Sequence, residues 1–300
     1  MGNAARIESL RARAVERHRA GALAEAEHFY RRILSLHSRD VEARHMLAVL
    51  RLQQGRVGEA LEIITGVATD APANPGVRTH HGLILHHLRR HREAMAEFET
   101  ALLINPGYAM TLLYRGNALL DLGQFAHALA DYETLLKATP QYDEVWFRRA
   151  SALWHLDRFE EALESYRRAL ALNPGHMAAL FNSGTVLLRL ERYGEAFEVF
   201  EKLRASVPNH PYALGAAAGA LLSCCDFTRW RQYQALIVDA VRDAGAVVAP
   251  LSFLPFCDDA RLRRMCAETF VADRVPPSGP TFMGGRTVRP RAVAHRLSVG

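Results

Sequence analysis

Histidines are the residues whose type and spacing come nearest to a site of chemistry. Five lie close together in the chain: His80, His81, His86, His87 and His91. His87 and His91 are four residues apart, the spacing at which two imidazoles on one helix can bind the same metal ion. Because no cysteine or nearby carboxylate completes a ligand set, we expect no metal site. We interpret the histidines as a partly exposed, pH-sensitive face.

Other reactive patterns are missing from the sequence. The four cysteines, Cys224, Cys225, Cys257 and Cys266, do not have zinc-site spacing, and we expect them to be buried free thiols. Gly284 and Gly285 lack the strand–turn–helix context of a phosphate-binding loop. Since no nucleophile is patterned with a base, the sequence predicts no catalytic and no cofactor-binding residues in this chain.

A helical hairpin is predicted for residues 143–176, and its pattern governs most of the chain. Apolar residues at spacings of three and four predict one helix from about Glu144 to Leu156 and a second from about Phe159 to Leu172. Pro174 ends the second helix, because proline cannot continue it. The segment is therefore a helix–turn–helix unit.

This unit recurs every 34 residues. A small residue recurs in the first helix at Ala14, Ala48, Gly82, Gly116, Ala150, Gly184 and Ala218. In the second helix an alanine recurs at Ala26, Ala60, Ala94, Ala128, Ala162 and Ala196, with a bulky residue after it at Tyr30, Ile64, Phe98, Tyr132, Tyr166 and Phe200. The small residues predict a close helix crossing, and Gly21, Gly55 and Gly123 predict left-handed turns inside their units.

The period and the pattern resemble the tetratricopeptide repeat. The resemblance implies an all-α fold, a right-handed superhelix of six full repeats over residues 1–210. A divergent seventh repeat and a capping helix are expected over residues 211–245, because Trp230 occupies the alanine position. Residues 246–300 are interpreted as a partly helical junction or linker, in which Asp258 or Asp259 caps a helix carrying Leu262 and Cys266.

Composition restricts the location and the partners. No apolar run approaches the roughly 18 residues needed to cross a bilayer. The N-terminus lacks the apolar core of a signal peptide, so we expect a cytoplasmic protein without a membrane partner. Residues 261–300 hold eight arginines and two acidic residues, so this segment has a net charge of +6, whereas the whole chain has a net charge of +5. The remainder is close to neutral at about −1, and no nucleic-acid partner is expected.

The resemblance to the tetratricopeptide repeat implies that three positions of each first helix line a concave groove, and periodicity places those positions on one stripe. The expected partner is a protein or an extended peptide in this groove. The oligomeric state cannot be read from the sequence. The residues expected to contact the peptide are Tyr114, Asn117, Asp121, Arg148, Ser151, His155, Asn182 and Arg189.

The segment after the repeats resembles a second family. Cys225–Trp230, the apolar stretch Pro250–Pro255, the helix after Asp258 and the final Arg296–Gly300 are similar to the junction of bacterial protein O-GlcNAc transferase-like glycosyltransferases. The resemblance implies a catalytic region after Gly300 that uses UDP-GlcNAc, with the repeats docking its protein substrates. A stand-alone, non-catalytic repeat adaptor is the alternative, and the sequence leaves both open.

Overall fold

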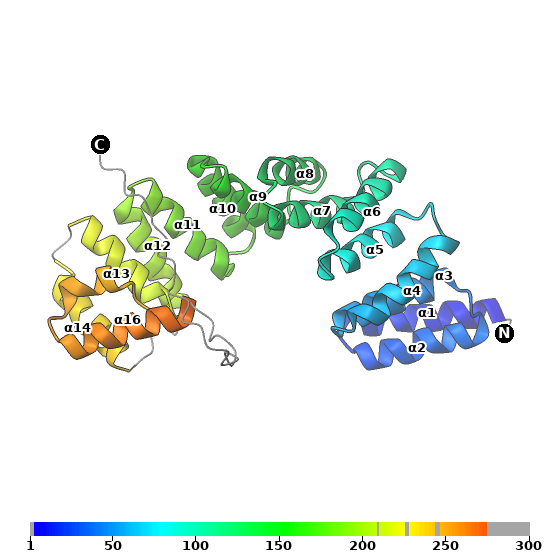
Figure 1. Ribbon diagram of the computed structural model, residues 1–300, viewed down its shortest axis with the longest axis horizontal. Helices are drawn as coiled ribbons and strands as arrows, with labels where there is room; N and C mark the ends of the chain where they lie inside the picture. Colours follow the sequence, from blue (N-terminus) through cyan, green and yellow to red (C-terminus); the bar gives the residue numbers. More distant parts are fainter. Residues whose placement is uncertain (1–2, 209, 226–227, 244–246, 275–300) are drawn as a thin grey trace, which may run out of the picture. The chain divides into compact units, whose positions relative to one another are not determined.

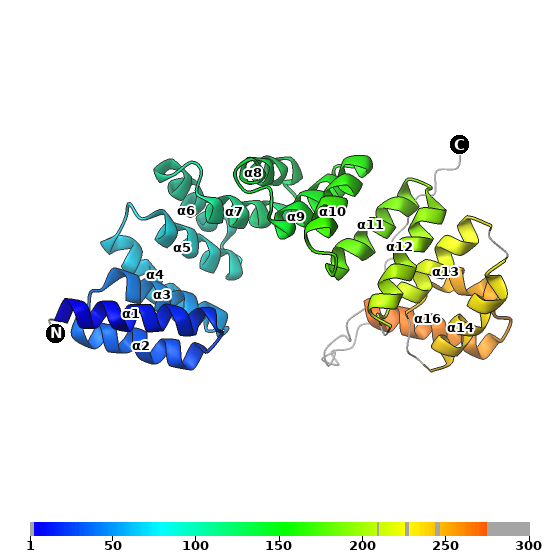
Figure 2. The ribbon, with the colours of Figure 1, turned by 180° about the vertical axis from the view of Figure 1, so that it is seen from behind.

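The computed structural model describes residues 3–208, 210–225, 228–243 and 247–274, and these residues form helices and turns without a strand (Figures 1 and 2). They belong to two compact units, Met1–Ser206 and Val207–Gly300. The predicted all-α fold is confirmed. The part of the predicted junction after residue 274, with the final Arg296–Gly300, lies outside the described residues.

The first unit consists of helical pairs, which follow one another along the chain in Figure 1. Its helices are α1 (Asn3–Arg19), α2 (Leu23–Leu36), α3 (Val41–Gln53), α4 (Val57–Asp70), α5 (Pro75–His87), α6 (His91–Ile104), α7 (Ala109–Asp121), α8 (Phe125–Ala138), α9 (Asp143–His155), α10 (Phe159–Leu172), α11 (Met177–Arg189) and α12 (Tyr193–Ser206). From α3 onward both helices of each pair begin 34 residues after their counterparts, as the sequence predicts.

A left-handed residue separates the two helices of each pair. Gly21, Gly55 and Gly123 have φ of 73°, 75° and 73°, which confirms the predicted turns. Non-glycine residues adopt the same conformation at the equivalent positions Arg89, Asp157, Glu191 and Cys225. The turn is therefore imposed by the hairpin, and glycine is only the easiest residue to place there.

The recurring small residues lie where the helices of a pair cross. A Cβ atom on Gly82 would lie 2.7 Å from the ring of Phe98, and one on Gly184 would lie 2.6 Å from the ring of Phe200. Ala150 makes the same close approach possible in the fifth pair, where it is fully buried. The aromatic ring of the second helix thus fills the space that a missing or small side chain leaves in the first.

Successive pairs stack so that each contacts mainly its neighbours. The second helix of one pair packs against the first helix of the next, as α8 does on α9 and α10 does on α11. The first helices α3, α5, α7 and α9 also contact one another in succession, more closely than the second helices of those pairs do. This difference places the first helices on the inner, concave wall of the first unit.

The second unit begins with the divergent seventh pair of helices. It contains α13 (Ala213–Ser223), α14 (Trp230–Arg242), α15 (Pro250–Phe253), the 3-10 helix η1 (Leu254–Phe256) and α16 (Ala260–Arg274). Trp230 stacks on Phe256 at a ring separation of 4.3 Å, which explains why alanine is not needed at that position. Asp259 Oδ1 accepts hydrogen bonds from the backbone N–H groups of Arg261 and Leu262, so the predicted helix cap is confirmed.

The cysteine prediction is only partly correct. All four thiols are free, but only Cys266 is buried, while Cys224 and Cys225 are exposed. The two exposed cysteines lie at the end of α13 and in the left-handed turn after it, where side chains point to solvent. No helix among the described residues has the length and apolar character needed to cross a membrane.

Candidate peptide-binding groove

The predicted groove residues all lie on first helices, on the inner wall of the first unit. Tyr114, Asn117 and Asp121 belong to α7, Arg148, Ser151 and His155 to α9, and Asn182 and Arg189 to α11. Each of these side chains is half-buried or exposed, so none is committed to the core. The structure brings three of them together and gives the others separate surroundings.

A pocket of about 290 Å³ opens between α9 and α11, and we call it the groove pocket. Its lining residues are Ser151, Trp154, His155, Tyr166, Phe181, Asn182 and Thr185. Ser151, His155 and Asn182 are the predicted residues that meet here. Because they come from two successive first helices, the pocket exists only where two repeats are stacked.

Tyr166 of α10 joins the two walls of the groove pocket. Its ring is almost fully buried, and its hydroxyl accepts a hydrogen bond of 3.3 Å from Asn182 Nδ2. Burial raises the pKa of Tyr166, and hydrogen bonding to Ser151 and Asn182 offsets part of that rise. The phenol therefore stays neutral and holds the amide of Asn182 in a fixed orientation.

Aromatic contacts hold the rim of the groove pocket. The imidazole of His155 stacks on Phe125 with ring centroids 4.3 Å apart and an angle of 7° between the planes. The guanidinium of Arg189 lies over Phe159 at 5.4 Å, and Phe159 in turn packs edge-on against Trp154. These contacts restrain the side chains without using up their hydrogen-bond donors.

The remaining predicted residues do not enter the groove pocket. Asn117 Oδ1 accepts a hydrogen bond of 2.7 Å from Tyr132 of its own hairpin, whereas Asn182 donates to Tyr166 of the preceding hairpin. Arg148 is bonded to Glu144 one turn away on its own helix. These side chains form the polar wall that continues from the pocket.

Two more predicted residues have different neighbours. Asp121 lies 3.0 Å from Nε2 of His86. Tyr114 lines a separate hollow of about 430 Å³ together with Tyr108, Met110 and Tyr142. The structure therefore divides the predicted set between one pocket, one aromatic hollow and several local pairs.

Sequence reasoning missed the aromatic members of the groove pocket. Trp154 and Phe181 occupy first-helix positions next to the predicted stripe, and the repeat pattern predicts only a packing role for Tyr166. A wider stripe would have included Trp154 and Phe181, because residues one position away still border the same face of a helix. Nothing in the local pattern indicates that Tyr166 also reaches the surface of the groove.

The histidines are distributed among several partners. Nε2 of His45 lies 2.9 Å from Nδ1 of His80, and that atom is also 3.0 Å from the backbone carbonyl of Gly76. His87 ends α5 and His91 begins α6, so the expectation that they lie one turn apart on a single helix is wrong. The left-handed residue Arg89 lies between them and reverses the chain.

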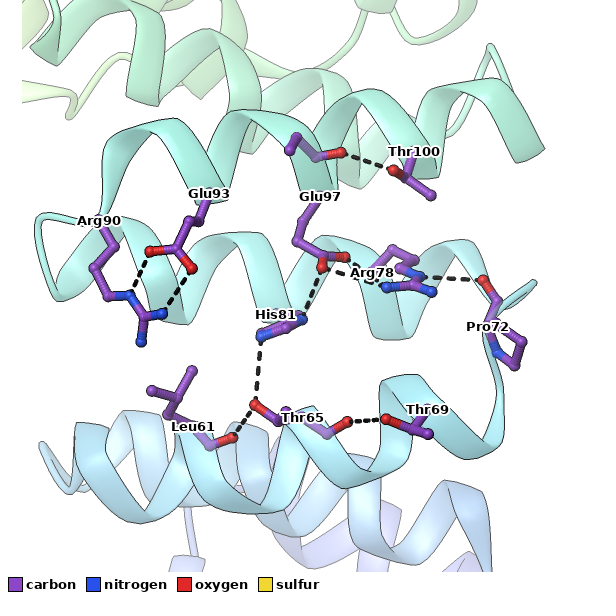
Figure 3. Close-up of polar contacts among 11 residues, drawn as sticks. Leu61, Thr65, Thr69, Pro72, Arg78, His81, Arg90, Glu93, Glu97 and Thr100 are labelled. Atoms are coloured by element: carbon purple, nitrogen blue, oxygen red, sulfur yellow. Dashed lines mark hydrogen bonds and ion pairs between the residues drawn. The ribbon is translucent and has the colours of Figure 1, made fainter.

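His81 takes part in a polar network between α4, α5 and α6 (Figure 3). Its Nδ1 atom lies 3.1 Å from Glu97 Oε1, and Arg78 donates to both oxygens of the same carboxylate. Burial alone would raise the pKa of Glu97, but the contacts with His81 and Arg78 outweigh it and lower that pKa. The carboxylate of Glu97 is thus held between the imidazole of His81 and the guanidinium of Arg78, both of its own hairpin.

The stacked hairpins and their inner wall define an α-solenoid that offers a groove to other proteins. Family models described as tetratricopeptide repeat match residues 18–84, 76–108, 113–176 and 156–211. These matches cover more than half of the chain, so the protein belongs to the tetratricopeptide repeat family. It is a scaffold for protein–protein interaction.

Solved structures agree with this fold. PilW, a type IV pilus biogenesis factor, is 18% identical with a TM-score of 0.58, covering 66% of this chain and 92% of PilW. A tetratricopeptide repeat protein from Parabacteroides merdae is 13% identical with a TM-score of 0.56, covering 88% of this chain and 98% of its own. YrrB, described as having an unusual peptide-binding site, is 16% identical with a TM-score of 0.53, and the match covers 68% of this chain and 97% of YrrB.

The comparison with curated protein sequences gives no match. At these levels of identity, the solved structures establish the fold of the chain and leave its partner to be inferred from the groove itself.

Proposed function

We propose that the groove of the first unit binds an extended segment of a partner protein, with one apolar or aromatic side chain of that segment in the groove pocket. The observation that carries this proposal is the groove pocket, in which polar groups from two repeats surround an aromatic interior. A volume of about 290 Å³ is at the lower end of the range for ligand pockets, and it suits one side chain better than a whole ligand.

Hydrogen bonding supports the extended form of the bound segment. An extended backbone exposes N–H and C=O groups that no neighbouring strand satisfies. The amide of Asn182 and the imidazole of His155 can each donate to or accept from such a backbone. Their orientation is already fixed by Tyr166 and by Phe125, so little side-chain entropy is lost on binding.

Filling the groove pocket tests the proposal. Thr185 lines the pocket, and its hydroxyl bonds to the carbonyl of Phe181 one turn earlier. Peptide ligands are first selected with the wild-type protein from a random display library. We expect the phenyl ring of Thr185→Phe to occupy the pocket and to lower the affinity for these peptides by about tenfold or more, measured by fluorescence anisotropy.

Thr134→Phe is the matched control. Thr134 lies exposed on α8 and makes the same hydroxyl-to-carbonyl bond, to Ala130, but it lines no described pocket. It should leave the affinity unchanged and should alter the melting temperature about as much as Thr185→Phe does. Equal binding by the two variants would remove the groove pocket from the proposal.

We further propose that the repeats dock substrates for an O-GlcNAc transferase-like glycosyltransferase region that uses UDP-GlcNAc. Support comes from the resemblance carried by Cys225–Trp230 and Pro250–Pro255. None of the described residues is assigned to the nucleotide sugar. Transfer of labelled GlcNAc from UDP-GlcNAc to a groove-binding protein by the natural gene product tests this proposal. A gene product that binds the protein without transfer supports the stand-alone adaptor instead.

A further inference from the structure

Two neighbouring hairpins hold a basic side chain and a carboxylate together at equivalent positions. In the third pair His81 of α5 contacts Glu97 of α6, as Figure 3 shows. In the fourth pair Arg115 of α7 donates two bonds, of 2.8 and 2.6 Å, to the buried carboxylate of Asp131 on α8. In both pairs the basic side chain of the first helix therefore contacts a carboxylate of its own hairpin.

The fifth pair breaks this arrangement. Arg149 is the equivalent cation, but the acidic position is occupied by Ser165, whose neutral hydroxyl is fully buried and accepts a 2.6 Å bond from Arg149 Nη1. The other amino group of Arg149 reaches back to Glu133 of the preceding hairpin at 2.9 Å. The side chain of Glu133 is 43% exposed, against 6% for Asp131 in the fourth pair. The charge of Arg149 is thus balanced only from the solvent side.

A hollow of about 450 Å³ opens at this point between α8, α9 and α10, and we call it the outer pocket. Its lining residues are Glu133, Leu136, Lys137, Trp146, Arg149, Glu164 and Arg168. Three cations thus face two carboxylates. Arg168 is paired with Glu164, whereas Lys137 is exposed and has no ion pair within the described part of the chain.

The floor of the outer pocket is apolar. Leu136 is buried, and the indole of Trp146 is held in place by its N–H, which donates to the carbonyl of Pro140 at 2.8 Å. The guanidinium of Arg149 lies 5.8 Å from the centroid of the Trp146 ring. An apolar surface beside an excess of positive charge favours a ligand that carries both an apolar group and a carboxylate.

We propose that the outer pocket binds an internal acidic segment of a partner protein, in which Asp or Glu lies next to a large apolar residue. The carboxylate pairs with Arg149 and Lys137, and the apolar side chain packs on Trp146 and Leu136. Charge complementarity selects this occupant, because the pocket has one more cation than carboxylates. Arg149 and Trp146 lie on the face of α9 opposite Ser151 and His155, so this site is independent of the proposed groove function.

The experiment uses the full chain and labelled peptides. The probe is the acidic peptide GSDLFEDGS with both termini blocked, and its neutral analogue is GSNLFQNGS. We expect the acidic peptide to bind at least about tenfold more tightly than the analogue at low salt, and the difference to shrink as salt screens the charges. Ser165→Asp should abolish most of that preference, because it supplies Arg149 with the carboxylate that Glu97 and Asp131 supply in the neighbouring hairpins.

Controls separate charge from folding. Asp131 and Glu97 already occupy the equivalent position, so Ser165→Asp should keep or raise the melting temperature. Lys137→Gln should weaken the binding of the acidic peptide. Lys202→Gln, which alters the other lysine of the chain, should leave that binding unchanged. Thr185→Phe should leave this binding intact, which distinguishes it from the groove.

Several results would overturn the inference. Equal affinity for the acidic and neutral peptides would show that charge does not determine binding. Undiminished binding of the acidic peptide by Ser165→Asp would show that Arg149 does not contact the peptide. Binding only of a peptide with a free terminal carboxylate would assign the pocket to chain ends. If the wild-type protein self-associates and Ser165→Asp abolishes that self-association, the occupant of the outer pocket is a second copy of the chain.

Discussion

At the scale of single residues, the left-handed turns show how strongly the hairpin constrains its sequence. Glu191 has φ of 58° at the position where three other pairs have glycine. The left-handed conformation costs an ordinary residue roughly 1 kcal/mol, because Cβ approaches a carbonyl oxygen. Glu191 therefore reduces the stability of the fold, and its exposed side chain has no described partner that would offset this.

Replacing Glu191 by glycine should stabilise the protein. We expect Glu191→Gly to raise the free energy of unfolding by about 0.5–1 kcal/mol, since glycine adopts this turn without strain. Gly55→Ala is the mirror experiment, because a Cβ there meets no atom within 4 Å and only the backbone conformation matters. It should destabilise by a similar amount in urea denaturation. Shifts of the same sign in both variants would contradict the explanation.

At the scale of helices, the contact between α3 and α5 includes a pair of histidines. His45 and His80 face each other at 2.9 Å. Burial, with a smaller contribution from His80, lowers the pKa of His45 to about 4, and burial also lowers the pKa of His80. Both rings are therefore neutral in the folded protein near pH 7, and one can donate a hydrogen bond to the other.

This pair predicts a loss of stability in mild acid. An unfolded His45 binds a proton near pH 6.5, but the folded protein resists it down to about pH 4. Stability should therefore fall as pH drops from about 6.5 to about 4, by roughly 3 kcal/mol from His45 alone. His45→Gln should flatten the dependence in that window. Glu27, whose pKa is lowered to about 2 chiefly by Arg51, contributes only below about pH 4.5 and provides an internal reference.

Helix boundaries could be read from the sequence almost to the residue. The predicted second helix of the fifth pair, Phe159–Leu172, matches α10, because proline and the left-handed turn fix both ends. Contacts between hairpins could not be read in this way. Arg149 contacts Glu133 of the preceding hairpin, and Tyr166 lines the groove pocket although its ring is part of the core. Such contacts depend on the angle between stacked pairs, which a repeating pattern does not encode.

At the scale of the whole molecule, the period of the sequence predicts the architecture of the repeat unit. Repeated small residues require close hairpins, and close hairpins can only stack in order. The groove is therefore predictable as a wall of first helices. The position of its pocket is not, because Trp154, Phe181 and Asn182 come together only once α9 and α11 are placed side by side.

The unbroken register from α3 to α12 gives these hairpins the same length and the same spacing. Every pair is followed by the next at the same spacing. A segment such as residues 109–142 could therefore be duplicated in the gene without changing its contacts with the preceding or the following hairpin. Lengthening by whole modules leaves each junction as it was, because every hairpin begins 34 residues after the one before it. Recombination at this spacing can therefore alter how much of a partner the protein spans while every existing contact keeps its place.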